Sequence, residues 1–309
     1  MCGFKKQVEE KTAEIETIIE KYLPAEEGYQ KTVLEAMNYS IHAGGKRLRP
    51  MLMQETYRLF GGKGTVVEPF MAAIEMIHTY SLIHDDLPCM DDDDLRRGKP
   101  TNHKVYGEST ALLAGDSLLT GAFEVAASNS EAGSDVSAKA VAYLASCAGR
   151  YGMVGGQIMD LEGEQKKLTL DQLLKLHSLK TGALISAAAV MGALAAGIEL
   201  TDPRMEDVVT FAENIGLAFQ IVDDILDSIN MCKSFMIITT KAEAIEKYIT
   251  ESMHRGATVY KAKGVYSGQD KEVIMTVCRR NEGLLEEDIR EYTGRTGGIH
   301  ESAKAKCYR

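Results

Sequence analysis

The sequence lacks the features that mark membrane-spanning, exported and disulfide-stapled proteins. It has no run of about 18 or more apolar residues, so we expect no transmembrane helix. The first residues, MCGFKKQVEEKTAEIE, become charged at once and contain no apolar signal core. No CxxC pair occurs among the six cysteines, which are Cys2, Cys89, Cys147, Cys232, Cys278 and Cys307. These absences argue against a zinc site and a disulfide framework and predict a cytoplasmic protein.

Basic side chains are fewer than acidic ones, 35 against 45, which gives a formal net charge of −10. The excess lies in residues 1–229, which hold 34 Asp+Glu and 21 Lys+Arg, whereas residues 230–309 hold 11 and 14. An acidic main body disfavours nonspecific nucleic-acid binding. It is compatible with a protein that gathers carboxylates around divalent cations.

Proline is scarce, and all six prolines precede residue 204, with long segments of helical period between them. Residues 67–84 are mostly apolar and predict a buried helix with Pro69 near its start. Further helices are expected over 8–22, 29–42, 49–59, 109–127, 135–152, 169–198 and 203–229. Residues 1–229 therefore predict a single all-α domain.

The pattern changes near Asn230. Residues 235–240 form a short β-branched run, and residues 257–266 and 272–278 predict two strands joined by a turn. Helices are expected over 241–254 and 284–292. Residues 230–309 therefore predict a separate small α/β domain of the βαββα kind.

Aspartate makes up six of the ten residues from 85 to 94. A solvated acidic loop is one interpretation. However, the cluster follows directly on the apolar helix predicted over 67–84, so Asp85 and Asp86 end a buried element. Two like charges about 4 Å apart repel by about 4 kcal/mol at an effective dielectric constant of about 20. The cluster therefore predicts a compensating cation.

A second carboxylate group lies in GLAFQIVDDILDSI. Asp223 and Asp227 are four residues apart and share one helix face, with Asp224 beside them and apolar neighbours around them. Burial of three carboxylates is costly without partners, so the alternatives are structural salt bridges or bound metal. Oxygen ligands without a His or Cys set indicate Mg²⁺ rather than Zn²⁺.

Basic residues that could bind phosphate occur in two short segments. GGKRLRP at 44–50 places three cations at a glycine turn before a helix, and LRRGKP at 95–100 places three more after the first acidic cluster. Arginine matches phosphate oxygens in bidentate fashion. No P-loop GxxxxGK[ST] occurs, which disfavours a Walker-type nucleotide enzyme. The combination predicts a site for a substrate with several phosphate groups and several Mg²⁺ ions.

These motifs resemble those of the trans-prenyltransferases of the isoprenyl diphosphate synthase family, above all the bacterial farnesyl and geranylgeranyl diphosphate synthases. DDLPCMD at 85–91 matches the first Asp-rich motif in its form with two extra residues, and DDILD at 223–227 matches the second. GGKRLRP, IHTYSLIHDD and LRRGKPTNH also match, and the resemblance covers about two thirds of the chain. It implies the isoprenoid synthase helical bundle.

The resemblance also implies an activity. The chain would condense isopentenyl diphosphate with dimethylallyl or geranyl diphosphate, head to tail, as a Mg²⁺-dependent cytoplasmic homodimer with three Mg²⁺ ions when diphosphate is bound. The implied metal ligands are Asp85, Asp86, Asp91, Asp223, Asp224 and Asp227. Arg96 would bind the allylic diphosphate, and Lys46, Arg49, His78 and Arg97 would bind isopentenyl diphosphate. Lys180, Thr181 and Gln220 would line the cavity near the developing carbocation.

For His78 and Gln220 the sequence itself adds an argument. Without the resemblance, a packed core histidine is the favoured interpretation of His78. Gln220 lies three residues before Asp223, so both can project to one side of a helix.

In the family, the fifth residue before the first Asp forms the floor of the chain-growth tunnel, and here it is Tyr80, followed by Ser81. The bulky ring favours farnesyl diphosphate as product, with geranylgeranyl diphosphate as the alternative.

The resemblance ends after Asp227. The family continues with a Gly-Asp pair and a lysine-bearing loop, whereas this chain reads SINMCKS. From residue 234 it resembles the small cytosolic domain that ends a family of bacterial multi-pass membrane proteins, the YitT type. A fusion protein is therefore expected. An inactive diphosphate-binding remnant and a regulatory fusion protein are open alternatives, whereas GGKRLRP argues against a terpene cyclase.

Overall fold

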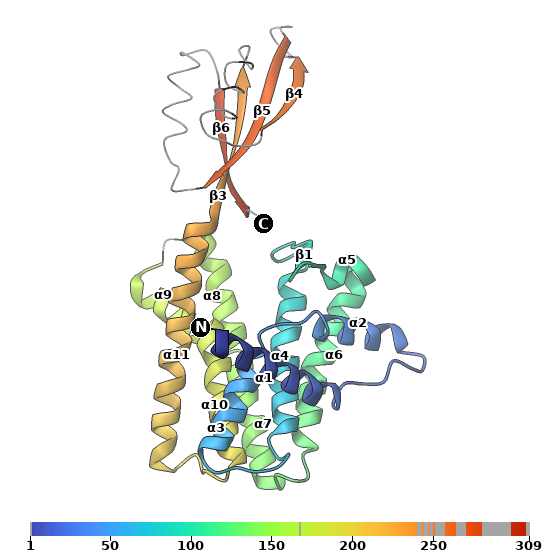
Figure 1. Cartoon of the computed structure of the whole chain (residues 1–309), viewed down its shortest axis with the longest axis vertical. Helices are drawn as coiled ribbons and strands as arrows, with labels where there is room; N and C mark the ends of the chain where they lie inside the picture. The colour runs from blue at the N-terminus through green and yellow to red at the C-terminus, as the bar shows by residue number, and fades with distance from the viewer. Residues whose placement is uncertain are drawn as a thin grey trace. The chain divides into compact units, whose positions relative to one another are not determined.

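The structure, a computed structural model, describes residues 2–166, 168–239, 243, 247, 250, 257–263, 270–279 and 298–306. The chain forms two compact units, Met1–Gln220 and Ile221–Arg309, which meet within one helix. Figure 1 shows the elements of both units in chain order.

The first unit is a helical bundle, which confirms the all-α fold class predicted from the sequence. Its first helices are α1 (Cys2–Glu20), α2 (Lys31–Ile41), α3 (Leu48–Leu59), α4 (Glu68–Asp85), α5 (Asn102–Tyr106) and α6 (Glu108–Ala127). The later ones are α7 (Ser134–Ala148), α8 (Met153–Gln165), α9 (Leu170–His177), α10 (Ala183–Ala195) and α11 (Pro203–Asn230). A π-helical turn, η1 (Ser178–Gly182), joins α9 to α10.

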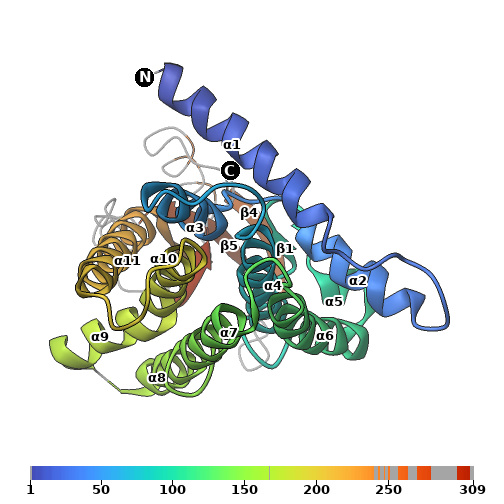
Figure 2. The ribbon, with the colours of Figure 1, turned by 90° about the horizontal axis from the view of Figure 1, so that it is seen from below.

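Helix α4 forms the centre of the bundle. Eleven of its 18 residues are buried, and they occur on all sides of the helix, as expected for an element surrounded by others. It packs against α6, α3, α1 and α10. Figure 2, seen along the helices, shows α4 among these neighbours. Because α4 ends at Asp85, the bundle interior leads directly to the first Asp-rich motif.

The segment predicted as one helix over 169–198 is interrupted. The turn η1 separates α9 from α10, and α10 is buried from Leu184 to Leu194 against α3 and α7. Leu170–Ala195 is the one stretch of the described chain long and apolar enough to cross a membrane. Its most apolar window is 67% buried inside the bundle, as is typical of a core helix.

Three elements differ from the sequence-based expectation. The helix predicted over 135–152 ends at Ala148, because the chain turns at Gly149 and Gly152 before it enters α8. Helix α8 was not predicted. A two-stranded hairpin of β1 (Leu95–Arg96) and β2 (Lys99–Pro100) was also not predicted.

The second unit begins within α11 and continues as a sheet. Strands β3 (Met231–Thr239), β4 (Ala257–Lys263), β5 (Asp270–Arg279) and β6 (Gly298–Lys306) are antiparallel in the order β4-β5-β3-β6. The first three overlap the predicted strands, whereas β6 was not predicted. The helices expected over 241–254 and 284–292 lie outside the described residues, apart from isolated positions in the first.

Candidate active site

The glycine turn between α2 and α3 directs its three cations differently. Gly44 and Gly45 have φ angles of 87° and 147°, and Arg47 adopts φ 48° at the N-terminal end of α3. The Arg47 guanidinium is buried, and its Nη1 donates to Glu75 Oε1 at 2.6 Å while its Nη2 donates to the Ile41 carbonyl at 2.6 Å. Through these two hydrogen bonds Arg47 holds the turn against α4.

The neighbouring cations line a pocket of about 420 Å³, whose wall also includes Arg47 and Glu75. Lys46, Arg49, His78 and Arg97, which come from the glycine turn, α3, α4 and the hairpin, all contribute to this wall. Arg49 Nε is buried and has no hydrogen-bond partner among the described residues. The four residues that the resemblance assigned to isopentenyl diphosphate thus lie around one cavity.

The charges of this pocket are incompletely balanced. Burial lowers the pKa of the Arg49 guanidinium, and Arg97 lowers it further while Glu75 opposes both effects. Burial, with Arg49 and Arg97 beside it, holds the pKa of His78 well below its usual value. His78 is therefore neutral at pH 7 and can act as a hydrogen-bonding group. An anion in this pocket would satisfy the free guanidinium donors.

The hairpin fixes the directions of two consecutive arginines. Its turn residues, Arg97 and Gly98, have φ angles of 55° and 78°, as in the type I′ turns that match the twist of paired strands. A Cβ on Gly45 would lie 2.7 Å from Arg97 Nη1, so this guanidinium packs directly against the Gly45 backbone. Arg97 therefore lines the cation-rich pocket, whereas Arg96 contacts the Asp-rich motif.

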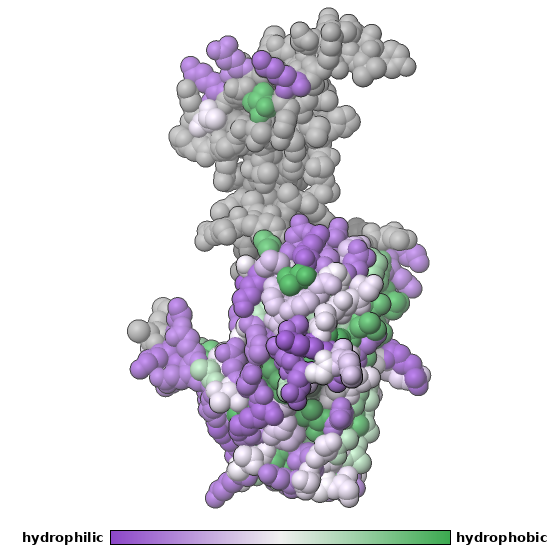
Figure 3. All heavy atoms as spheres, turned by 90° about the vertical axis from the view of Figure 1, so that its right-hand side faces the viewer, coloured by the Kyte–Doolittle hydropathy of each residue, from purple (hydrophilic) through white to green (hydrophobic). Residues whose placement is uncertain are grey.

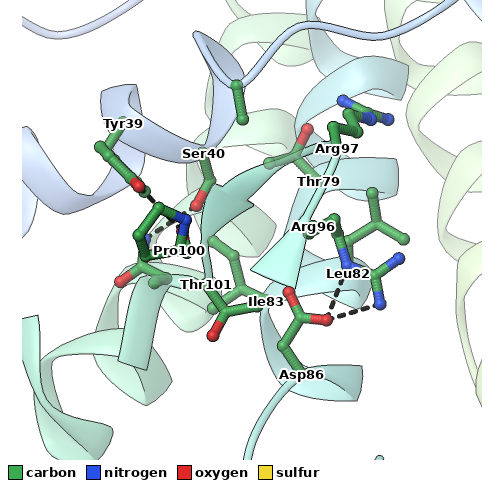
Figure 4. Close-up of a pocket in the computed structure, with 12 residues that line it drawn as sticks. Tyr39, Ser40, Thr79, Leu82, Ile83, Asp86, Arg96, Arg97, Pro100 and Thr101 are labelled. Carbon is green, nitrogen blue, oxygen red and sulfur yellow. Dashed lines mark hydrogen bonds and ion pairs between the residues drawn. The ribbon is translucent and has the colours of Figure 1, made fainter. Parts of the chain in front are cut away.

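Arg96 forms an ion pair with Asp86. Its Nε and Nη2 lie 2.6 Å and 2.5 Å from Asp86 Oδ1. Figure 4 marks these two contacts with dashed lines. Burial raises the pKa of Asp86, and the guanidinium opposes this shift. The adjacent pocket has a volume of only about 20 Å³. In this arrangement Arg96 balances the carboxylate that ends the buried helix.

The loop after α4 brings Asp91 back toward Asp85. The Asp91 N–H donates to the Asp85 carbonyl at 2.8 Å. Burial raises the pKa of Asp85 to about 6; Asp91 adds to the shift, and Lys180 opposes it. No group of three metal-ligating side chains is gathered within the described part of the chain. The carboxylate oxygens of the motif nevertheless fit a hard divalent cation.

The π-helical turn η1 presents the next two predicted residues. Lys180 Nζ lies 2.5 Å from Asp160 Oδ2 on α8, and Thr181 Oγ1 donates to Gln220 Oε1 on α11 at 2.7 Å. Single π-helical turns occur frequently at functional sites. The Lys180 ammonium also acts electrostatically on Asp85 of the first Asp-rich motif.

The two predicted chain-length residues lie on α4. Tyr80 is buried, and its ring meets the His84 ring edge-on at 5.6 Å. Burial and the nearby Asp85 raise the pKa of the Tyr80 hydroxyl to about 12. Ser81 Oγ donates to the His78 carbonyl of its own helix at 2.9 Å. Tyr80 therefore occupies the bundle interior below the Asp-rich motif.

The second Asp-rich motif lies in the part of α11 that belongs to the second unit. The side chains of Asp223, Asp224 and Asp227 are outside the described structure. Their participation in a metal site stays a prediction.

Sequence reasoning did not identify Asp160 or Glu75. A signal existed for Glu75, because it is a single carboxylate within the apolar residues of α4 and had to find a buried partner. Asp160 lies in α8, a helix that was not predicted, so no feature of the sequence pointed to it.

Comparison with known proteins agrees with this arrangement. The Polyprenyl synthetase family model matches residues 30–235. A farnesyl diphosphate synthase from Geobacillus stearothermophilus is 50% identical over 215 residues, which are 69% of this chain and 71% of that protein. A geranylgeranyl diphosphate synthase from Cyanophora paradoxa is 47% identical over 218 residues, 70% of this chain and 71% of that protein.

Structural comparison gives the same result. The crystal structure of an FPP/GFPP synthase from Zymomonas mobilis has a TM-score of 0.69 at 39% identity and covers 74% of this chain and 82% of that one. A second family model, described as an uncharacterized protein conserved in bacteria (DUF2179), matches residues 255–291 and is consistent with the resemblance of the tail. The chain therefore belongs to the polyprenyl synthetase family of transferases.

Proposed function

We propose that this protein condenses isopentenyl diphosphate with an allylic diphosphate, head to tail, in a Mg²⁺-dependent reaction. The observation that carries the proposal is the pocket formed by Lys46, Arg49, His78 and Arg97, with its unpartnered guanidinium Nε. A diphosphate offers the oxygens that these donors lack. The first Asp-rich motif, beside Arg96 and Lys180, supports a second diphosphate site.

In the proposed reaction the allylic C–O bond breaks, a C–C bond forms to the alkene of isopentenyl diphosphate, and a proton leaves. Mg²⁺, held by the six aspartates of the two motifs, would supply charge that stabilises the departing diphosphate. The Lys180 ammonium would add a fixed positive charge. The hydroxyl of Thr181 and the amide oxygen of Gln220 would direct dipoles at the carbocation, while the apolar bundle excludes water.

We propose farnesyl diphosphate as the product. The buried Tyr80 ring supports this choice, because it fills the interior where a longer chain would have to pass. Geranylgeranyl diphosphate synthase is the second candidate, since relatives with that name match at 47% identity, close to the 50% of a farnesyl diphosphate synthase.

We also propose that the enzyme works as a cytoplasmic homodimer. Val105, Leu112 and Leu113 of α5 and α6 are each about half exposed. Figure 3 shows the side of the molecule that carries these helices, with apolar patches among polar ones. Contact between two copies would bury such side chains. Residues 230–309 are proposed as a separate domain, and a diphosphate-binding remnant without turnover is the alternative to an active enzyme.

The test combines the purified protein, Mg²⁺, isopentenyl diphosphate and one allylic diphosphate, with products identified by mass spectrometry. Farnesyl diphosphate from geranyl diphosphate supports the proposal. Binding of isopentenyl diphosphate without any product would favour the remnant, and absence of both would refute the assignment.

A further inference from the structure

Two helices hold the η1 turn in the same way. On α8, a Cβ on Gly156 would lie 2.4 Å from the Lys180 backbone nitrogen, and Asp160, one helical turn later, binds the Lys180 side chain. On α11, a Cβ on Gly216 would lie 2.8 Å from Gly182 Cα, and Gln220, one turn later, binds the Thr181 side chain. Each glycine allows backbone contact, and each polar residue then reaches a side chain of η1.

The Asp160–Lys180 pair contributes little to stability. The two side chains are 43% and 34% exposed, and solvated ion pairs add little to stability because water screens their attraction. Lys180 has a second carboxylate nearby, because its charge acts on Asp85. A lysine side chain has many accessible rotamers, so its ammonium can pair with either carboxylate unless one of them holds it.

We propose that Asp160 is a positioning residue that holds the Lys180 ammonium away from Asp85 and oriented toward the allylic diphosphate. The proposal rests on the proposed function, since Lys180 is assigned to that substrate there. Without Asp160, the ammonium can pair with the Asp85 carboxylate and occupy an oxygen that a divalent cation needs. Anion binding then has to break that pair and order the lysine as well, which weakens it.

The experiment measures binding of inorganic pyrophosphate in the presence of Mg²⁺ by titration calorimetry. Asp160→Asn, which keeps the shape and removes the charge, should raise the Kd at least fivefold. Glu162→Gln is the matched control, since it removes one exposed carboxylate from the same helix. It should leave the Kd within twofold. In a Lys180→Met background, Asp160→Asn should have no further effect.

An unchanged or lower Kd for pyrophosphate in Asp160→Asn would overturn the proposal. If Asp160 merely adds negative charge near the site, Asp160→Asn will bind pyrophosphate as well as or better than the parent. An effect that persists in the Lys180→Met background would also refute it. Where the parent turns over, Asp160→Asn should raise the KM for the allylic diphosphate at least fivefold and leave that for isopentenyl diphosphate unchanged. If the parent binds pyrophosphate without turnover, the proposed function is contradicted. The calorimetric titration still tests the positioning role of Asp160 in that case.

Discussion

Two arginines that lie two residues apart provide a direct test of the site, because the structure gives them different roles. Arg47 and Glu75 are each 2% exposed and joined at 2.6 Å, and Arg47 also donates to the Ile41 carbonyl. Replacement of Arg47 by Met leaves the Glu75 carboxylate buried and unpaired. Removal of one partner from a buried pair costs about 3–5 kcal/mol. Arg47→Met should therefore lower the free energy of unfolding by that amount.

Arg49→Met should behave differently. The Arg49 Nε already lacks a hydrogen-bond partner in the described structure, and burial lowers the pKa of its guanidinium. Its removal relieves an uncompensated charge, so stability should change by less than about 1 kcal/mol or rise. Binding of isopentenyl diphosphate should instead weaken by about 2 kcal/mol, the contribution of a hydrogen bond to a charged group.

The assays are urea unfolding followed by far-ultraviolet circular dichroism and calorimetric titration with isopentenyl diphosphate. Glu75→Leu added to Arg47→Met should restore only part of the lost stability, since it removes the unpaired carboxylate but also the negative charge that opposes the burial of Arg49. The reasoning would be wrong if Arg47→Met cost less than about 1 kcal/mol or if Arg49→Met bound the ligand as well as the parent.

Three further predictions test other parts of the site. Tyr80→Ala should lengthen the product, because the buried ring would no longer close the interior, and an unchanged product by mass would place the limit elsewhere. Chelation of divalent ions should abolish turnover, and Asp85→Ala should cost at least about 3 kcal/mol of transition-state stabilisation in kcat/KM; full activity in EDTA contradicts the metal assignment. The pKa of His78 is lowered in the folded chain. Below about pH 6.5 the unfolded chain therefore binds a proton at this residue that the folded chain does not bind. The parent should then lose stability relative to His78→Gln, by up to about 1.4 kcal/mol per pH unit, and parallel unfolding curves from pH 8 to about 5.5 would refute this.

The sequence predicted the helical bundle because its apolar residues recur with helical period, and it located Asp85 at the end of a buried helix for the same reason. It could not distinguish Arg47 from Arg49, since that difference depends on Glu75, 28 residues away from Arg47. The η1 turn was hidden within one continuous apolar segment, because a π-helical turn changes hydrogen bonding but not the hydrophobic pattern.

The tail was harder to predict. Strand β6 follows a segment with many polar residues, and its pairing with β3 is set by contacts about 65 residues apart along the chain rather than by local pattern. The second Asp-rich motif was located by sequence alone, from the spacing of its three aspartates on one helix.

The hairpin of β1 and β2 joins the two halves of the site through a single peptide bond. Arg96 pairs with Asp86, and the next residue, Arg97, lines the cation-rich pocket. An inserted or deleted residue would shift the register of the two strands and turn both guanidiniums away together. The hairpin should therefore accept changes of side chain at Leu95 or Lys99 far more readily than any change of length. In a library of variants across this segment, substitutions should be tolerated and insertions should not.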